Sequence, residues 1–75
     1  MSRILSEGEL TRRFGERVRD IRKKQRFSQE DLAGKIEMDL TSINEIEKGH
    51  RSPKLITMYK IAHALGVSLS DLTDL

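Results

Sequence analysis

The chain contains no cysteine, one proline and three aromatic residues among its 75 residues. Without cysteine, neither disulfide bonds nor thiolate metal sites can stabilise the fold, and the absence also fits a reducing compartment. The sequence has no apolar run long enough to cross a bilayer and no apolar signal region at its start. We therefore expect a cytoplasmic protein without a membrane partner, forming a single domain over residues 1–75 with a modest core.

The sequence also lacks the patterns of catalytic and metal-binding sites. His50 and His63 are isolated and have no matching ligand cluster. A glycine-rich phosphate loop and a nucleophile–base pair at motif spacing are both missing. We expect no metal site, no cofactor and no enzymatic activity.

Charge is unevenly distributed, although the net charge is only +2. Residues 1–27 carry a net charge of +5, and residues 28–75 carry −3. The basic part could attract phosphate groups. The alternative is a solvated helix face, and charge alone leaves both interpretations open.

Strand patterns are absent, and the spacing of apolar residues predicts an all-α protein with five helices. The first helix is expected over 6–25, because Ser6 and Glu9 form a capping box. Its apolar stripe is Leu10, Phe14, Val18 and Ile21.

Two short helices follow, joined by a tight turn over 37–39. Ser28 is the expected N-cap of the first, and Asp39 is that of the second. The second of these helices ends at Lys48, with Gly49 in the left-handed position after it. The expected inward residues of the two helices are Leu32, Ala33, Ile36, Ile43, Ile46 and Glu47.

The fourth helix is expected to begin at Ser52 and Pro53, as N-cap and first helical residue. Gly66 ends it, and Ser68 opens a short last helix. The expected inner stripe of the fourth helix is Leu55, Met58, Ile61, Ala62 and Leu65.

Several motifs at these spacings resemble the Cro and phage-repressor type of helix-turn-helix family. They are Arg19-Asp20-Ile21-Arg22, Ser28-Gln29-Glu30-Asp31-Leu32-Ala33, Ile43, Ile46-Glu47-Lys48-Gly49, Pro53 and Ile61-Ala62-His63-Ala64-Leu65-Gly66-Val67. The resemblance covers about residues 14–72 and leaves 1–10 as an N-terminal extension, which either packs on the domain or extends as a basic arm. It implies a compact five-helix bundle of the lambda-repressor-like type, with the second and third helices forming the helix-turn-helix.

The resemblance also implies a function: sequence-specific regulation of transcription by binding double-stranded DNA. Among the family's members, the chain is most like the restriction-modification controller proteins, on the pattern Asp39-x-Thr41-x-Ile43 and an apolar surface described below. A phage Cro or repressor-type regulator is the alternative. An antitoxin or other protein-interaction module is an alternative of another class, distinguished by a toxin-wrapping tail and by no DNA binding at low salt.

The outer face of the third helix supplies the side chains that could reach base edges in the major groove. Asn44 could read adenine, and Glu45 could accept from a cytosine amino group. Glu45 could instead pair with Lys48 or Arg51 and contact no base. The expected base-reading residues are Leu40, Thr41, Asn44 and Glu45.

The family resemblance assigns contacts to the DNA backbone and one internal ion pair. It places Gln29, in the first turn of the second helix, against a phosphate, and it pairs Arg22 with Glu47. Lys23, Lys24 and Arg26 are either further phosphate contacts or solvent-exposed. The expected phosphate contacts are Ser28, Gln29, Lys48, Arg51 and Lys54.

A symmetric homodimer on a two-fold operator is expected, because one short module rarely binds DNA tightly. Ile56 and Tyr59 are apolar residues on the outer side of the fourth helix. Tyr59 could instead pack locally on the last helix. The expected dimer surface is Ile56, Tyr59, Val67, Leu69 and Leu75, and RNA polymerase is a further candidate partner.

Two turn positions depart from the family pattern. Glu37 and Arg26 stand where the family usually has glycine. Because a positive φ is uncommon in other residues, these helix ends are expected to be either strained or reshaped.

Overall fold

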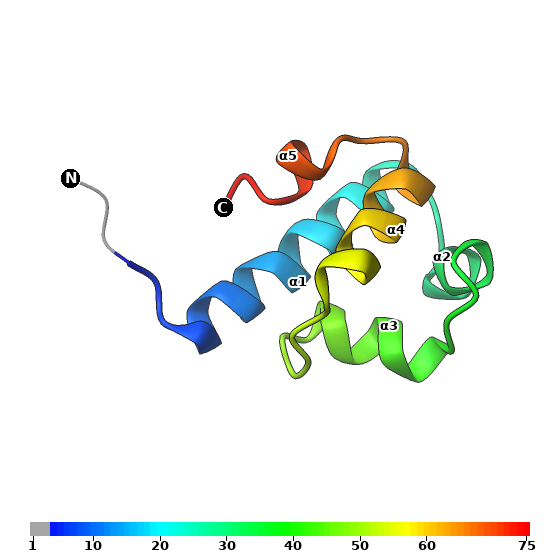
Figure 1. Ribbon diagram of the computed structural model, residues 1–75. Coiled ribbons are helices and arrows are strands. Elements are labelled where there is room, and N and C mark those ends of the chain that lie inside the picture. Colours follow the sequence, from blue (N-terminus) through cyan, green and yellow to red (C-terminus); the bar gives the residue numbers. More distant parts are fainter. Residues whose placement is uncertain (1–3) are drawn as a thin grey trace.

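The computed structural model describes residues 4–75, and this part of the chain folds into five α-helices. They are α1 (Glu7–Lys24), α2 (Gln29–Lys35), α3 (Leu40–Glu47), α4 (Leu55–Leu65) and α5 (Leu69–Leu72). The long α1 runs through the molecule and packs against α3, α4 and α5, while α2 packs against α3 and α4 (Figure 1). The predicted all-α, five-helix fold is confirmed. The first three residues of the predicted N-terminal extension lie outside the described residues.

The core is built where the four longer helices meet, and Leu72 of α5 covers one side of it. Its buried residues are Phe14, Val18, Leu32, Ala33, Ile36, Ile43, Ile46, Ile61, Ala62, Leu65 and Leu72.

Two residues of the predicted stripes are exposed, whereas Ile21 and Met58 are partly buried against the core. Leu10 is 47% exposed, because it lies one turn before Phe14, where α1 projects beyond the other helices (Figure 1). Leu55 is 65% exposed, because it is the first residue of α4 and does not lie over the core.

The first four helices end in the same way. A residue in the left-handed conformation follows each helix: Arg26 (φ 60°), Glu37 (φ 56°), Gly49 (φ 77°) and Gly66 (φ 69°). In each case the next residue donates its backbone N–H to the carbonyl five residues earlier, as in a Schellman motif. Arg26 and Glu37 therefore adopt the glycine-like conformation, so these helix ends are strained and not reshaped.

The left-handed residue directs its follower back onto the bundle. Phe27, Met38 and Val67 follow Arg26, Glu37 and Gly66, and all three are half-buried against the core. The ends of α1, α2 and α4 thus add apolar contacts as well as satisfying carbonyl groups.

The predicted start of α4 is wrong. The helix begins at Leu55, with Lys54 in the N-cap position and no side-chain cap. Ser52 and Pro53 lie in the loop, where Pro53 is half-buried and lines an apolar hollow with Phe14 and Met58. The proline ring therefore packs in the loop and does not open the helix.

The other predicted N-caps are present. The hydroxyls of Ser6, Ser28 and Ser68 each accept a hydrogen bond from the backbone N–H three residues on. The carboxylate of Asp39 accepts from the N–H of Ser42 at 2.6 Å. These caps set where α1, α2, α3 and α5 begin.

Candidate nucleic-acid interface

The helix α3 presents one face to the core and the opposite face to solvent. Ser42, Ile43, Ile46 and Glu47 are buried. Of the predicted base-reading residues, Leu40 and Thr41 are exposed, whereas Asn44 and Glu45 are half-buried at the edges of the outer face. The outer face of α3 can therefore contact another molecule without any change in the core.

An ion pair joins α1 to α3, as the family resemblance implied. Arg22 Nε donates to Glu47 Oε2 at 2.6 Å, and Arg22 Nη2 donates to Glu47 Oε1 at 2.9 Å. Both residues are buried, and hydrogen bonding to Glu47 raises the pKa of the Arg22 guanidinium, whereas burial acts in the opposite direction. Arg22 Nη1 also donates to the carbonyl of Phe27 at 2.7 Å, which ties down the loop before α2.

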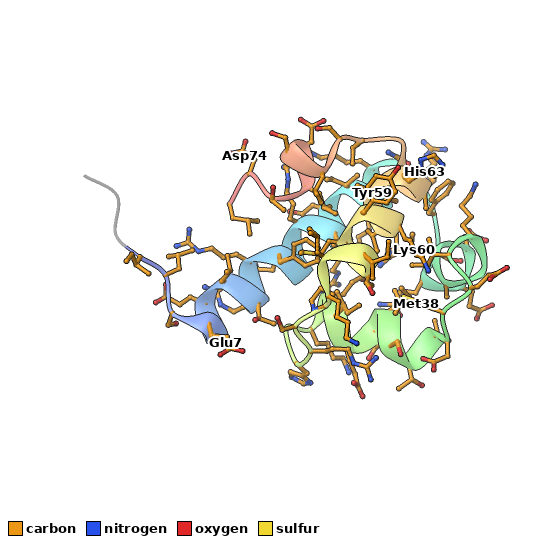
Figure 2. The ribbon with its side chains drawn as sticks, viewed as in Figure 1. Glu7, Met38, Tyr59, Lys60, His63 and Asp74 are labelled. Carbon is orange, nitrogen blue, oxygen red and sulfur yellow. The ribbon has the colours of Figure 1, made fainter. Side chains whose placement is uncertain are left out.

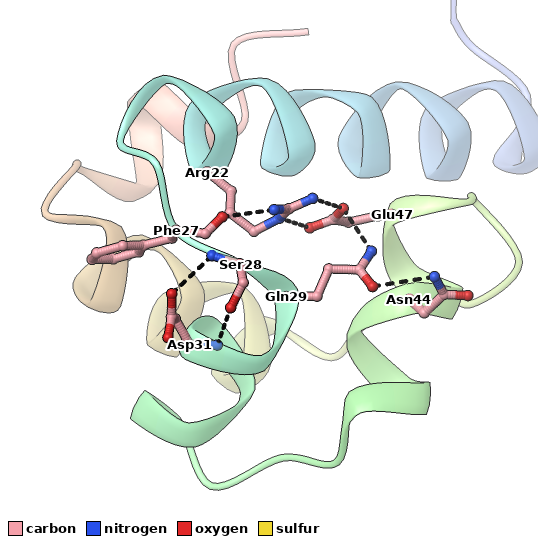
Figure 3. A network of polar contacts seen from close by, with 7 residues as sticks. All are labelled: Arg22, Phe27, Ser28, Gln29, Asp31, Asn44 and Glu47. Atoms are coloured by element: carbon pink, nitrogen blue, oxygen red, sulfur yellow. Dashed lines mark hydrogen bonds and ion pairs between the residues drawn. The ribbon is translucent and has the colours of Figure 1, made fainter.

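The ion pair continues into a chain of side-chain amides that sequence reasoning did not predict (Figure 3). Gln29 Nε2 donates to Glu47 Oε1 at 3.0 Å, and Asn44 Nδ2 donates to Gln29 Oε1 at 3.2 Å. This series of hydrogen bonds thus runs from α1 through α3 and α2 and back to the edge of the outer face of α3. The periodicity of the sequence does not predict such contacts, because they depend on how α2 and α3 cross.

A polar hollow of about 220 Å³ lies over this network. Arg19 of α1 and Lys48, directly after α3, are both exposed and add positive charge to it. Its lining residues are Arg19, Arg22, Gln29, Asn44, Glu47 and Lys48. Arg19 was not among the predicted site residues, although it lies one helical turn before Arg22.

Arg51 is held against α3 by two contacts. Its Nη1 donates to the hydroxyl of buried Ser42 at 2.7 Å, and its Nη2 lies 3.3 Å from Glu45 Oε2. The pairing of Glu45 with Arg51, one of the two predicted alternatives, is therefore present. Both side chains remain at least 40% exposed, so each can still contact a ligand. The sequence did not indicate Ser42 as a partner of Arg51.

The remaining predicted phosphate contacts differ in whether their side chains are already hydrogen-bonded within the protein or exposed. Ser28 caps α2: its hydroxyl accepts from the N–H of Asp31 at 2.9 Å and its own N–H donates to Asp31 Oδ2 at 2.9 Å. Lys48 and Lys54 are exposed at the two ends of the loop between α3 and α4. None of these contacts has been tested, and all stay predictions.

The outer side of α4 carries an apolar surface formed by Leu55, Ile56 and Tyr59, which are each at least 56% exposed. Tyr59 stacks on His63 of the same helix, with ring centroids 6.3 Å apart (Figure 2). Of the other predicted dimer residues, Val67 is half-buried against the core and Leu69 is half-buried, and their place in a dimer stays a prediction. Leu75, at 36% exposed, lies at the margin.

Among residues 4–75, no group of histidine and acidic side chains has the geometry of a metal site. Within the same residues, no helix is both long and apolar enough to cross a membrane.

The sequence profile of the helix-turn-helix family matches residues 18–72. The chain belongs to this family. It is 45% identical over 62 residues to control protein C.BamHI of Bacillus amyloliquefaciens, covering 81% of this chain and 76% of that one. It is 41% identical over 61 residues to control protein C.MunI of a Mycoplasma species, covering 80% and 82% of the two chains.

A solved structure supports the same assignment. The restriction-modification controller protein C.AhdI of Aeromonas hydrophila superimposes with a TM-score of 0.80 at 33% identity, covering 85% of this chain and 96% of that one. The predicted family, its lambda-repressor-like fold and the resemblance to controller proteins are confirmed. As a member of this family, the protein is a DNA-binding transcription regulator and not an enzyme.

Proposed function

We propose that the regulator binds a two-fold operator as a symmetric homodimer, with α3 in the major groove, and controls transcription as restriction-modification controllers do, including that of its own gene. The observation that carries this proposal is the outer face of α3, which is open to solvent while its inner face is fixed by the core and by Arg22. A rigid helix with an exposed polar face can enter the major groove without rearrangement.

The proposed division of labour follows the exposure of each side chain. Leu40, Thr41, Asn44 and Glu45 would contact base edges, and Lys48 and Lys54 would contact phosphates. Ser28, Gln29 and Arg51 would add backbone contacts while retaining the internal bonds described above. Bacterial DNA lies in the cytoplasm, and we propose the same location for this protein.

The surface of Leu55, Ile56 and Tyr59 supports the dimer. Large apolar side chains on one helix face are typical of protein interfaces, and pairing α4 and α5 of two copies would cover them. A two-fold arrangement would set the two α3 helices against half-sites about one helical turn apart. RNA polymerase bound beside the operator is a further proposed partner.

The controller type is preferred to a phage repressor because the similarity to the control proteins runs over most of both chains. Selection of bound duplexes from random-sequence DNA tests the proposal. We expect enrichment of a two-fold symmetric sequence. Absence of any DNA binding at low salt would favour a protein-interaction module, and enrichment of one isolated half-site would contradict the dimer.

A further inference from the structure

The polar chain in Figure 3 has a fixed direction. Arg22 can only donate hydrogen bonds, and the carboxylate of Glu47 can only accept them. Glu47 therefore requires the amino group of Gln29, whose Nε2 lies 3.0 Å from Glu47 Oε1. This leaves the carbonyl of Gln29 facing Asn44, where it accepts from Nδ2 at 3.2 Å. The buried ion pair thus sets the orientation of both amides in turn.

Burial makes this direction hard to reverse. Arg22 and Glu47 are only 7% and 6% exposed, so water has little access to the carboxylate. Turning the Gln29 amide around would place its carbonyl oxygen against that carboxylate and leave two acceptors without a donor between them. Buried acceptors without a partner are strongly unfavourable.

The orientation matters for how Asn44 can read a base. Adenine presents its N6 donor beside its N7 acceptor, and an asparagine matches them with its carbonyl oxygen and one amino hydrogen. A freely turning amide can present oxygen and nitrogen in either order. When one Asn44 amino hydrogen is bonded to Gln29, the oxygen and the other hydrogen are held in a single order.

We infer that Gln29 is a positioning residue for Asn44, and that the Arg22–Glu47 ion pair acts through it to narrow the base preference of the regulator at one position of its operator. This inference rests on the proposed function, because it describes how one side chain of the proposed base-reading face is held. It assigns to Gln29 an effect on sequence preference in addition to any contact with a phosphate.

The first test needs no DNA. Gln25, Gln29 and Asn44 are the only side-chain amides of the chain, so their NH₂ signals in a ¹H–¹⁵N spectrum are easily assigned. Gln29→Met should shift an Asn44 amide proton. The Gln25 signals should not move, because its amide donates to the carbonyl of Leu65. Unmoved Asn44 signals would overturn the inference.

The second test compares base preferences of variants on the selected operator. Asn44→Ala identifies the base pair concerned, where we expect preference to fall about 5- to 150-fold. Gln29→Met should weaken preference at the same base pair by at least about twofold, and should add no further loss in the Asn44→Ala background. Methionine keeps the length of the side chain, and Glu47 keeps its two hydrogen bonds from Arg22.

Lys48→Met is the matched control, because Lys48 lines the same hollow. It should weaken binding evenly across sequences and flatten the salt dependence by about one unit. If Gln29→Met instead weakens binding evenly across sequences, Gln29 only contacts phosphate and the inference is wrong. It is also wrong if the wild type selects an operator but Asn44→Ala changes no preference. If the wild type selects no sequence at all, the proposed function fails, and the inference fails with it.

Discussion

At the scale of single residues, Glu47 connects the helices that form the interface. Its carboxylate accepts two hydrogen bonds from Arg22 of α1 and one from Gln29 of α2, so three helices meet at one buried charge. The family resemblance predicted its partnership with Arg22. The link to Gln29 and Asn44 could not be predicted, because it depends on the relative placement of two helices and not on spacing within either.

Removing either member of this ion pair should destabilise the protein. Arg22→Ala and Glu47→Ala each leave a buried charge unpaired, and we expect each to lower the free energy of unfolding by about 3–5 kcal/mol. Urea unfolding measures the change. Arg12→Ala is the control, since the pair of Arg12 and Glu16 is exposed and should contribute less than about 1 kcal/mol. An unchanged melting temperature in both buried-pair variants would refute this role.

The left-handed residues Glu37 and Arg26 should limit stability. A residue with a side chain lowers stability by about 1–2 kcal/mol when it adopts this conformation. Glycine avoids that loss, but its more flexible unfolded state cancels part of the gain. We expect Glu37→Gly to raise the free energy of unfolding by about 0.5–1 kcal/mol. Gly66→Ala is the converse control, because no atom lies near the added methyl group and only φ is unfavourable. It should lower stability, and equal effects of the two substitutions would contradict the argument.

At the scale of elements, the contact of α1 with α3 determines how the interface helix is held. The two backbones approach closely at Gly15 and Gly49, where an added Cβ would lie 2.2 Å from the carbonyl oxygen of Ile46 and 2.8 Å from Cα of Arg12. The helices themselves were largely predictable, because capping residues and apolar periodicity act locally. The start of α4 was not, because the place of Pro53 in the loop depends on the tertiary structure, in which it lines an apolar hollow together with Phe14 and Met58.

Gly15→Ala tests the close approach. The methyl group would meet a backbone oxygen that cannot move alone, so α1 and α3 must separate, and we expect a loss of about 1–3 kcal/mol in unfolding free energy. Gly34→Ala is the matched control on α2, where no atom lies within 4 Å of the added group. Alanine's better helix propensity should stabilise that variant by up to about 1 kcal/mol. Stabilisation by both would show that the helices do not touch there.

The caps of α2 and α3 should make stability depend on acid pH. Hydrogen bonds from Ser28 hold the pKa of Asp31 below its usual value, and those from Ser42 do the same for Asp39. Because the folded-state pKa is the lower one, the stabilisation is complete above the unfolded value of about 3.9 and is lost as pH falls through the folded value.

Asp39→Asn isolates the contribution of one charge. We expect the variant to be less stable than the wild type at pH 7. The difference should shrink as pH falls below the unfolded value of about 3.9, because the unfolded chain then takes up a proton while the folded carboxylate still resists protonation. Urea unfolding at pH 7 and pH 3 measures it. A difference that is the same at both pH values would show that the charge of Asp39 does not contribute.

At the scale of the whole molecule, the basic α1, the outer face of α3 and the apolar side of α4 form three distinct surfaces, of which the last two carry the proposed base and dimer contacts. The sequence indicated all three, because each follows from charge or from helical spacing. The exposed part of the third surface is smaller than the predicted dimer surface, since spacing alone places Val67 outward after Gly66. The left-handed conformation of Gly66 instead turns Val67 onto the core.

If the protein is a dimer through α4, a charge placed on the apolar surface of α4 should halve the mass that sediments. Wild-type protein should sediment as a dimer at micromolar concentration, and Ile56→Lys should sediment as a monomer with unchanged helix content, because it places a charge in the apolar contact. Leu40→Lys adds the same charge to the exposed outer face of α3 and should remain dimeric. A monomeric wild type at high micromolar concentration would exclude the proposed interface.

The role proposed for α3 is to read a DNA sequence. The most direct test compares, at one salt concentration, the dissociation constants for the selected operator and for a scrambled duplex of the same length and composition. We expect the operator to be bound at least about 10³-fold more tightly. Equal affinity for the two duplexes would mean that the protein binds only the phosphate backbone, and would contradict the role proposed for the outer face of α3.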